Sequence, residues 1–325
     1  MVKVGLISLA HMHGISYANA LKSIPYAELV GIYDRDGQRR DKYAKEFGVK
    51  SFSDLESLLK EVDAVIICSE NSLHAEYTIK SAQAGKHVLC EKPLASNLAD
   101  AEKMVEVCKE NNVILQTAFP IRFSTPVVRA KEIIDSGAIG EILAIAGTNH
   151  GKMPPGWFLD KELAGGGAVF DHTVHVVDIM RWYLNSEVAQ VYAEVDTLLH
   201  DVDIDDAGML TMEFENGVIA TLDPCWSRPK TFPTWGDVTM KIVGTKGTLA
   251  VDAFAQTGEV FSDVVGHSQY NFWGDDADQA MVKDFIDCIV EKRPPRASGV
   301  DGMRATEVAL AAYESANQVK PVKLR

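Results

Sequence analysis

The chain has 325 residues, of which 46% are hydrophobic and 24% charged, so it has the length for two domains and the apolar content for a sizeable core. A formal net charge of −14 argues against a nucleic-acid partner, because binding to phosphate backbones depends on clustered Lys and Arg. The five cysteines form no C-x-x-C pair, which predicts neither a zinc knuckle nor a disulfide framework and favours a reducing cytoplasm. The N-terminal segment does not resemble a signal peptide and no apolar run has membrane-spanning length, so no membrane partner is expected.

About the first 120 residues alternate short apolar runs with segments of helical spacing. The runs that are typical of strands are VKVGLIS, AELVGIYD, DAVIICS, KHVLCEKP and VILQTAF. Because these runs are apolar throughout, they suit strands covered on both faces, which predicts an α/β fold with a doubly wound parallel sheet and right-handed crossovers. Gly48, Gly85 and the pair Asn111-Asn112 stand where left-handed residues are expected to end helices.

The pattern changes after about Thr125. Segments with helical spacing are Val127 to Ser136, Gly165 to Leu184 and, at the end, Gly302 to Gln318. Between them, alternating runs predict hairpins that turn at Asn216-Gly217 and around Lys246-Gly247. Hairpins require an antiparallel sheet, so we predict two domains, 1–121 and 122–325, the second of α+β class, with the last helix packing back on the rest.

The first strand runs into ISLAHMHG, where a dinucleotide-binding fold carries the motif G-x-G-x-x-G. Ser8, Ala10 and His13 stand at the three glycine positions. Ser8 can form the turn and add a hydroxyl donor, and Ala10 adds only one methyl group. His13 replaces the glycine that normally permits close packing of helix on strand, although Gly14 follows it. We predict that backbone N–H groups around His11 and Met12 bind a pyrophosphate.

Asp34 follows the second strand, 26 residues beyond Ser8, where an acidic residue binds the ribose hydroxyls of a dinucleotide. The alternative is a helix N-cap or a surface charge. Arg35, the next residue, could meet a 2′-phosphate, but Asp34 would repel that phosphate. This pair therefore favours NAD over NADP and leaves dual use open.

A lysine stands at the end of the strand KHVLC, within Glu91-Lys92-Pro93. Open α/β sheets bind ligands at the carboxyl ends of their strands, and Pro93 pushes the backbone of Lys92 towards an extended conformation. Lys92 is therefore expected at the mouth of a cleft. The alternative is an ordinary solvated lysine in a loop.

The stretch AGGGAVFDHTVHVVDIMRWYL predicts a helix that is mostly apolar and therefore buried. At 100° per residue, Asp171, His175 and Asp178 share one face, and His172 lies at its edge. Buried Asp and His side chains are costly unless they are paired, so this face is either a satisfied core network or a site. Taken together with Lys92, the pattern favours a site.

The Rossmann-like start, SENSLH, AGKHVLCEKPL and GGGAVFDHTVHVVDIMRW, in this order, resemble the glucose-fructose oxidoreductase, inositol dehydrogenase and MocA family of NAD(P)-dependent oxidoreductases. The likeness extends from Val2 to the closing DGMRATEVALAAYESANQ. It implies an N-terminal Rossmann domain and a second domain with an open, mostly antiparallel sheet, whose outer face builds homodimers or homotetramers. The glycine-poor loop is the main departure from the family pattern.

The resemblance also implies roles for individual residues. Lys92 would lie beside the reacting hydroxyl and the nicotinamide, Asp171 would bind a substrate hydroxyl, and His175 would accept or donate the proton. Residues expected to contact the cofactor are Ser8, Ala10, His11, Met12, Asp34, Arg35, Ser69, Asn71, His74, Glu91 and Lys92. Residues expected to contact the substrate are Arg122, Trp157, Asp171, His172 and His175.

These residue types suit the oxidation of a secondary alcohol, or its reverse. A neutral His175 can take the hydroxyl proton near pH 7, and a cationic Lys92 would stabilise the developing alkoxide. We therefore expect an NAD-dependent enzyme, with NADP use left open, that acts on a sugar, a cyclitol or a related polyol. Two other functions stay open: a ligand sensor without catalysis, and an NAD-dependent glycoside hydrolase or epimerase that oxidises its sugar transiently.

Several histidines invite a metal-site interpretation, namely His11, His13, His74, His150, His172 and His175. However, His11 and His13 lie in the loop expected to bind phosphate, and the pairs come from separate segments of the chain. No metal ion is therefore predicted.

Overall fold

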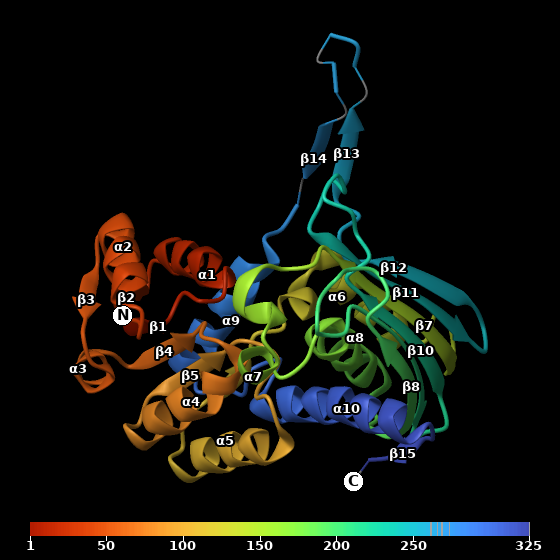
Figure 1. The fold of residues 1–325 in the computed structure, drawn as a ribbon, viewed down its shortest axis with the longest axis horizontal. Coiled ribbons are helices and arrows are strands. Elements are labelled where there is room, and N and C mark those ends of the chain that lie inside the picture. Colours follow the sequence, from red (N-terminus) through yellow and green to blue (C-terminus); the bar gives the residue numbers. More distant parts are fainter. Residues whose placement is uncertain (261, 265, 268, 273, 325) are drawn as a thin grey trace. The chain divides into compact units, whose positions relative to one another are not determined.

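The computed structural model describes residues 1–260, 262–264, 266–267, 269–272 and 274–324. The chain forms two compact units (Figure 1). Unit 1 consists of Met1–Pro120, Gly156–Gly166 and Asp278–Glu307, and unit 2 of Ile121–Pro155, Gly167–Ala277 and Val308–Arg325. The expected boundary after residue 121 lies beside Pro120, but residues 156–166 and 278–307, placed in the second domain by the sequence analysis, belong to unit 1.

Unit 1 is built on a six-stranded parallel sheet with the order β3-β2-β1-β4-β5-β6. Its strands are β1 (Val2–Ile7), β2 (Ala27–Tyr33), β3 (Lys50–Phe52), β4 (Ala64–Ile67), β5 (His87–Cys90) and β6 (Leu115–Thr117). The predicted Rossmann architecture is confirmed, and β3 is the strand that the sequence analysis missed, because its two exposed residues leave no apolar run. The order reverses between β1 and β4, and the carboxyl ends of strands at such a switch point form the ligand edge of the fold.

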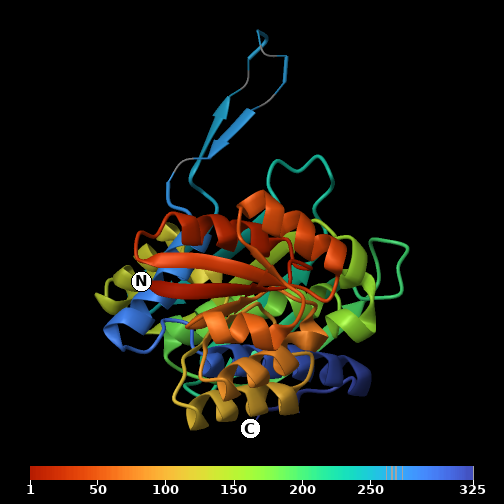
Figure 2. The same ribbon diagram turned by 90° about the vertical axis from the view of Figure 1, so that its left-hand side faces the viewer.

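Helices cover both faces of this sheet. They are α1 (His13–Lys22), α2 (Gly37–Phe47), α3 (Leu55–Glu61), α4 (His74–Gln83), α5 (Leu98–Glu110), α7 (Lys161–Ala164) and α9 (Ala277–Glu291), with the short η1 (Asn71–Leu73) and η3 (Gly156–Leu159). In Figure 2, α1 and α2 lie over one face and α4 and α5 over the other. Side chains from α3, α4 and α5 bury one apolar cluster against β1, β4 and β5, which is why these strands are mostly apolar. The predicted helix ends at Gly48, Gly85 and Asn112 are confirmed by positive φ values of 69°, 73° and 54°.

Unit 2 contains a seven-stranded sheet with the order β12-β11-β7-β10-β9-β8-β15. Its strands are β7 (Ile142–Gly151), β8 (Val188–Asp196), β9 (Ala207–Phe214), β10 (Ile219–Cys225), β11 (Gly236–Gly244), β12 (Thr248–Asp252) and β15 (Val322–Lys323), beside a separate hairpin of β13 (Thr257–Val260) and β14 (Gln269–Phe272). All its pairs are antiparallel except β7 with β10, so the expected mostly antiparallel sheet and both predicted hairpins are confirmed.

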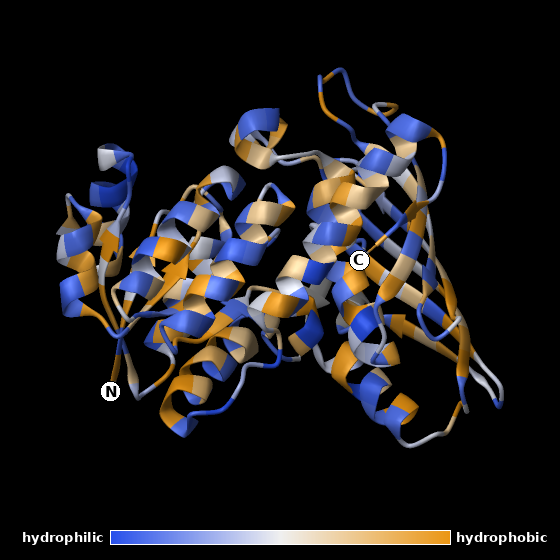
Figure 3. Ribbon diagram, turned by 90° about the horizontal axis from the view of Figure 1, so that it is seen from below, coloured by the Kyte–Doolittle hydropathy of each residue, from blue (hydrophilic) through white to orange (hydrophobic). Residues whose placement is uncertain are grey.

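One face of this sheet is covered by α8 (Ala168–Leu184). A Cβ atom on Gly147 of β7 would lie 2.8 Å from Met180 and 2.9 Å from Val176 of α8, so only glycine lets the helix approach the strand this closely. The long strands carry hydrophobic and hydrophilic residues in turn (Figure 3), as expected when one face of a sheet is buried and the other is not.

The other helices of unit 2 are α6 (Thr125–Asp135) and most of α10 (Gly299–Gln318), and η2 (Pro120–Phe123) precedes α6. In the part of the chain that the structure describes, none of the helices combines the length and the hydropathy that a membrane span requires.

Candidate active site

The loop between β1 and α1 closes without the usual glycines. Ser8, at the first glycine position, has φ of +65° and is buried. Its hydroxyl donates to Asp34 Oδ2 at 3.0 Å and accepts from the backbone N–H of Ala10 at 3.1 Å. These two hydrogen bonds offset the strain of a left-handed serine. Gly14 packs against Cys68 at the end of β4, where a Cβ atom would lie 3.3 Å from the cysteine Cβ, so Gly14 provides the close helix–strand contact that His13 cannot.

Asp34, at the end of β2, is almost completely buried and accepts hydrogen bonds at both oxygens. The backbone N–H groups of Leu9 and Asp36 donate to it, each at 2.9 Å. Arg39 of α2 adds a bidentate pair, with Nε 2.6 Å from Oδ2 and Nη2 2.8 Å from Oδ1. Burial by itself would raise the pKa of Asp34, but these hydrogen bonds outweigh it and lower the pKa. The carboxylate is therefore ionised and holds the phosphate loop in place.

Arg35, which the sequence analysis expected to meet a 2′-phosphate, instead pairs with Glu76 of α4. Its guanidinium is half exposed, lies 2.5 Å from Glu76 Oε2 of α4, and covers the ring of Tyr77 at 5.3 Å. Arg39 is instead the cation next to Asp34. The helix N-cap that was the alternative role for Asp34 belongs to Asp36, whose side chain accepts from the N–H groups of Gln38 and Arg39.

Most amide groups of the phosphate loop have partners inside the protein. The N–H of His11 donates to the carbonyl of Cys68 at 2.9 Å, and the N–H of His13 donates to His11 Nδ1 at 3.2 Å. Within the described residues, the N–H of Met12 has no acceptor, and the Met12 side chain is half exposed. Of the two amides predicted for the pyrophosphate, only that of Met12 is open to a ligand.

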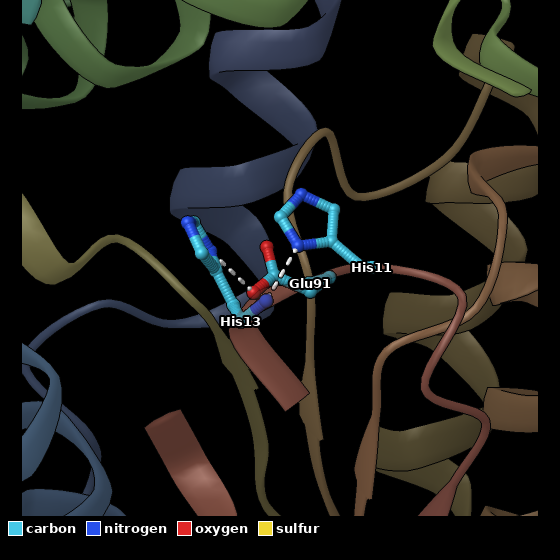
Figure 4. Close-up of side chains that lie close together, drawn as sticks. All are labelled: His11, His13 and Glu91. Carbon is cyan, nitrogen blue, oxygen red and sulfur yellow. Dashed lines mark hydrogen bonds and ion pairs between the residues drawn. The ribbon is translucent and has the colours of Figure 1, made fainter. Parts of the chain in front are cut away.

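Two histidines and a glutamate meet beside this loop (Figure 4). His13 Nδ1 donates to Glu91 Oε1 at 3.0 Å, and the two imidazole centroids of His11 and His13 are 4.3 Å apart. The Glu91 side chain is fully buried, whereas 32% of the His13 side chain is exposed. Burial would raise the pKa of Glu91, but the neighbouring His11, His13 and Lys92 outweigh it and lower that pKa. Burial would lower the pKa of His13, but Glu91 raises it overall.

Trp157, predicted as a substrate contact, lies against the phosphate loop within unit 1. Its indole N–H donates to the carbonyl of Ala10 at 3.1 Å, and its ring stacks on Phe158 at 4.0 Å. The ring of His11 lies 5.3 Å from that of Phe158. Trp157 and Phe158 of η3 therefore pack against the loop between β1 and α1 and help to hold it in place.

The residues after β4 line the same edge of the sheet. His74 is fully buried, and its two ring nitrogens lie 2.9 Å from the carbonyl of Pro93 and 3.2 Å from that of Ser69. Burial lowers the pKa of His74, although the two carbonyl groups oppose the shift, and the ring lies between the turns that follow β4 and β5. The Asn71 amide donates to the carbonyl of Ala164 at 2.8 Å, while its buried Oδ1 has no partner among the described residues.

Lys92 follows β5 directly and is 4% exposed. Its backbone N–H donates to Glu91 Oε2 at 3.0 Å, which fixes the carboxylate on the side away from His13. The alternative of an ordinary solvated lysine is wrong, because the Lys92 side chain is buried. A buried ammonium group is rare without a specific role or partner.

In unit 2, the start of α8 is held by residues that the sequence analysis did not identify. Asp205 accepts from the backbone N–H groups of Gly167 and Val169, each at 2.9 Å, and Tyr313 donates to the same carboxylate at 2.8 Å. A Cβ on Gly167 would lie 1.9 Å from the carbonyl oxygen of Asp205, which requires glycine here. Burial raises the pKa of Asp205 although these hydrogen bonds oppose the shift.

The polar residues of α8 are almost completely buried. Asp171 and His175, one turn apart, are 8% and 5% exposed. His172, predicted to contact substrate, is fully buried, and its Nδ1 lies 2.9 Å from the carbonyl of Asn149 on β7. Its Nε2 is 3.4 Å from Asp171 Oδ2. His172 is therefore bonded to the sheet through Asn149, while Asp171 and His175 make up the slightly exposed part of this polar face.

Arg122, another predicted substrate contact, forms a buried ion pair with Asp178 of α8. Its Nε lies 2.8 Å from Asp178 Oδ2 and its Nη2 2.5 Å from Oδ1, and its guanidinium covers the ring of Trp182 at 5.5 Å. The sequence analysis placed Asp178 on the same helix face as Asp171 and His175. Because Asp178 is paired with Arg122, this part of the face is a buried core network, which was the alternative to a site.

Comparisons with known proteins agree with this architecture. Residues 2–119 match the family model described as "Oxidoreductase family, NAD-binding Rossmann fold", and residues 127–250 match that of the GFO/IDH/MocA C-terminal domain. The chain is 33% identical to myo-inositol 2-dehydrogenase of Thermotoga maritima, over 99% of this chain and 98% of that one. It is 31% identical to 1,5-anhydro-D-fructose reductase of Ensifer adhaerens, over 89% of each chain.

Among solved structures, levoglucosan dehydrogenase in complex with NADH and levoglucosan superimposes with a TM-score of 0.86 at 27% identity, covering 99% of each chain. GenD2 from gentamicin A biosynthesis, in complex with NAD, superimposes with a TM-score of 0.91 at 25% identity, covering 100% of this chain and 96% of that one. The protein therefore belongs to the Gfo/Idh/MocA family, is an oxidoreductase of the sugar and cyclitol dehydrogenase type, and uses NAD as its cofactor.

Proposed function

We propose that this enzyme transfers a hydride between NAD and a secondary alcohol or ketone of a sugar, cyclitol or related polyol. The observation that carries the proposal is the pair Asp171 and His175, one helical turn apart and almost completely buried on the mostly apolar helix α8. A proton acceptor and a hydroxyl-binding carboxylate on one helix face are what alcohol oxidation needs besides a hydride acceptor.

The residues of unit 1 fit a dinucleotide. The unpartnered N–H of Met12, at the start of α1, suits a pyrophosphate oxygen, and the ionised Asp34 suits ribose hydroxyls. The buried Oδ1 of Asn71 supports a polar ligand at the same edge, because orphaned buried acceptors are rare. The remaining proposed contacts are Ser8, Ala10, His11, Ser69, His74, Glu91 and Lys92. When bound, the nicotinamide supplies the hydride acceptor or donor.

The chain's own groups handle the proton and the charge. His175 accepts the hydroxyl proton when the alcohol is oxidised and returns it when the ketone is reduced. The ammonium group of Lys92 stabilises the negative charge that develops on the substrate oxygen. Asp171 binds a neighbouring hydroxyl, and His172, whose Nε2 lies 3.4 Å from Asp171 Oδ2, packs beside that carboxylate. A polyol suits this density of donors and acceptors.

The relatives indicate which compounds to test first. Relatives include enzymes named for their action on myo-inositol, 1,5-anhydro-D-fructose, levoglucosan and D-xylose. The purified chain would be incubated with NAD⁺ and each polyol, or with NADH and each ketose, and the nicotinamide absorbance followed. A change in nicotinamide absorbance with at least one polyol or ketose supports the proposal. No change with any polyol or ketose of a wide panel contradicts it.

Variants separate the proposed roles. We expect Lys92→Ala to lower kcat by about 10²–10⁴-fold while NADH binding is retained. Lys103→Ala is the matched control, because Lys103 is an exposed lysine of α5 that pairs only with Glu106 among the described residues. His175→Gln should likewise lower kcat, because the proposed proton acceptor is lost. Near-normal turnover in a folded Lys92→Ala protein would contradict the mechanism.

The same assay decides between this proposal and its alternatives. Cofactor that stays bound while sugar is epimerised or a glycoside is cleaved, with no net NADH release, would identify transient oxidation. Ligand binding without any turnover would identify a sensor.

We also propose a homodimer or homotetramer in a reducing compartment. The face of the unit 2 sheet away from α8 carries the exposed side chains of Met209 and Ile219, and all five cysteines are free.

A further inference from the structure

The H-x-H motif of the phosphate loop and the glutamate after β5 form a cluster, and the proposed cofactor contacts of His11 and Glu91 do not explain why these residues and His13 gather in one place. One ring nitrogen each of His11 and His13 and one carboxylate oxygen of Glu91 lie within 4.8 Å of one another. Figure 4 shows the imidazoles of His11, in the turn before α1, and of His13, the first residue of α1, on either side of the Glu91 carboxylate. Three donor atoms at this separation can reach a common centre with small side-chain adjustments, since metal–nitrogen and metal–oxygen bonds are about 2.0–2.2 Å.

Each donor group is already held in place. The imidazole of His11 accepts the N–H of His13 at 3.2 Å and packs against the ring of Phe158 at 5.3 Å. The second oxygen of Glu91 accepts the N–H of Lys92 at 3.0 Å. Tyr17 OH lies 3.3 Å from His13 Nδ1. Donors that are oriented by surrounding groups lose little entropy when they coordinate an ion.

Charge and access also suit a cation. A carboxylate with no exposed area is costly in a low dielectric unless a cation neutralises it. With two neutral imidazoles the set carries one negative charge, which a divalent cation would compensate. The exposed third of His13 leaves a route by which an ion could enter. Imidazole nitrogens select transition metals over Mg²⁺ and Ca²⁺, which prefer oxygen ligands.

We propose that His11, His13 and Glu91 bind one divalent transition-metal ion, of the Zn²⁺ or Co²⁺ class. The sequence analysis predicted no metal because it assigned both histidines to phosphate and did not connect them to Glu91. The connection arises from the sheet order, in which β4 is the only strand between β1 and β5. The inference concerns the apo-protein and does not depend on the identity of the polyol substrate.

The competing explanation is a metal-free ion pair between a protonated His13 and Glu91. The two explanations differ in a measurable way. An ion pair predicts no stoichiometric metal binding, and the proposed site predicts one Co²⁺ or Zn²⁺ per chain that resists competition by Mg²⁺.

The test is a titration of the full chain, stripped of dinucleotide, with Co²⁺ followed by its visible ligand-field bands and with Zn²⁺ followed by calorimetry. We expect one equivalent of each metal to bind, and Glu91→Gln and His13→Gln each to weaken binding by about tenfold or more. His200→Gln is the matched control, because His200 is a partly exposed histidine beside Asp206 in unit 2, and it should leave the titration unchanged.

His13→Gly serves as a second test of the metal site if His13→Gln disturbs the loop. This variant restores the third glycine of the dinucleotide motif, so the loop should fold and bind NADH while metal binding is weakened. The thermal unfolding midpoint of each variant shows whether the protein is intact. Absence of stoichiometric binding in the unaltered chain, or unchanged binding in the folded Glu91→Gln and His13→Gly proteins, overturns the proposal without touching the hydride-transfer proposal.

Discussion

A histidine on the sheet of unit 2 makes protein stability depend on pH. His150 of β7 lies between carboxylates on both neighbouring strands, with Nε2 3.0 Å from Asp223 Oδ2 on β10 and Nδ1 3.2 Å from Asp237 Oδ1 on β11. Hydrogen bonds to Asp223 and Asp237 outweigh partial burial and raise the pKa of His150 from 6.5 to about 9. The perturbation is His150→Gln, which keeps an amide donor but removes the positive charge.

The size of the effect follows from the two pKa values. The difference between 6.5 and about 9 corresponds, at about 1.4 kcal/mol per pH unit, to about 3 kcal/mol, and solvent near the partly exposed ring reduces this to about 2 kcal/mol. Because the pKa is higher in the folded state, this stabilisation is fully present below pH 6.5 and is lost as the pH rises through about 9. His150→Gln should therefore lower the free energy of unfolding by about 2 kcal/mol at pH 6 and by much less at pH 10.

Urea unfolding, followed by far-UV circular dichroism at fixed protein concentration, measures this difference at half-unit steps between pH 6 and pH 10. Asp223→Asn is the partner control, since it removes one of the two carboxylates and should reduce the same pH dependence. A gap between wild type and His150→Gln that is equal at pH 6 and pH 10 would refute the electrostatic argument.

Three further outcomes are expected. Arg39→Ala should weaken NADPH binding at least about tenfold more than NADH binding, because it leaves the ionised Asp34 without its counter-charge; equal losses in fluorescence titrations would contradict this. Asp205→Ala should cost about 2 kcal/mol in urea unfolding and lower kcat, because two N–H groups at the start of α8 lose their acceptor; an unchanged midpoint would be inconsistent with that cap. Ile219→Lys, on the open sheet face, should reduce the molar mass measured by light scattering, and an unchanged oligomer would show that this face is not the interface.

The architecture could be predicted because its determinants are local. Continuous apolar runs indicate strands covered on both faces, and alternating runs joined by Asn216-Gly217 indicate a hairpin. Gly48 and Gly85 end helices because each residue's own backbone adopts a left-handed conformation. The prediction missed β3 for the same reason, since a strand of three residues with one buried side chain carries too little pattern.

The site could be predicted only in part. The pattern D-x-x-x-H on an apolar helix is sufficient to select Asp171 and His175, because their spacing alone puts them on one face. The same reasoning wrongly placed Asp178 with the site, because its carboxylate is paired with Arg122, 56 residues away in the chain. The sequence analysis named only Arg35 as a cation near Asp34 and did not consider Arg39, since only the path of α2 shows that the Arg39 guanidinium turns back towards β2.

The sequence by itself determined the alternation of strands and helices in the first domain, the hairpins of the second, the family to which the chain belongs, and the residue types available for hydride transfer chemistry. Tertiary structure alone decided the partners of the charged and polar groups. It placed His13 against Glu91, 78 residues away, Asp205 against the start of α8, and Arg39 against Asp34. The physical reason is that hydrophobic patterning acts over a few residues, whereas ion pairs and hydrogen bonds of this kind depend on which strands become neighbours when the sheet forms.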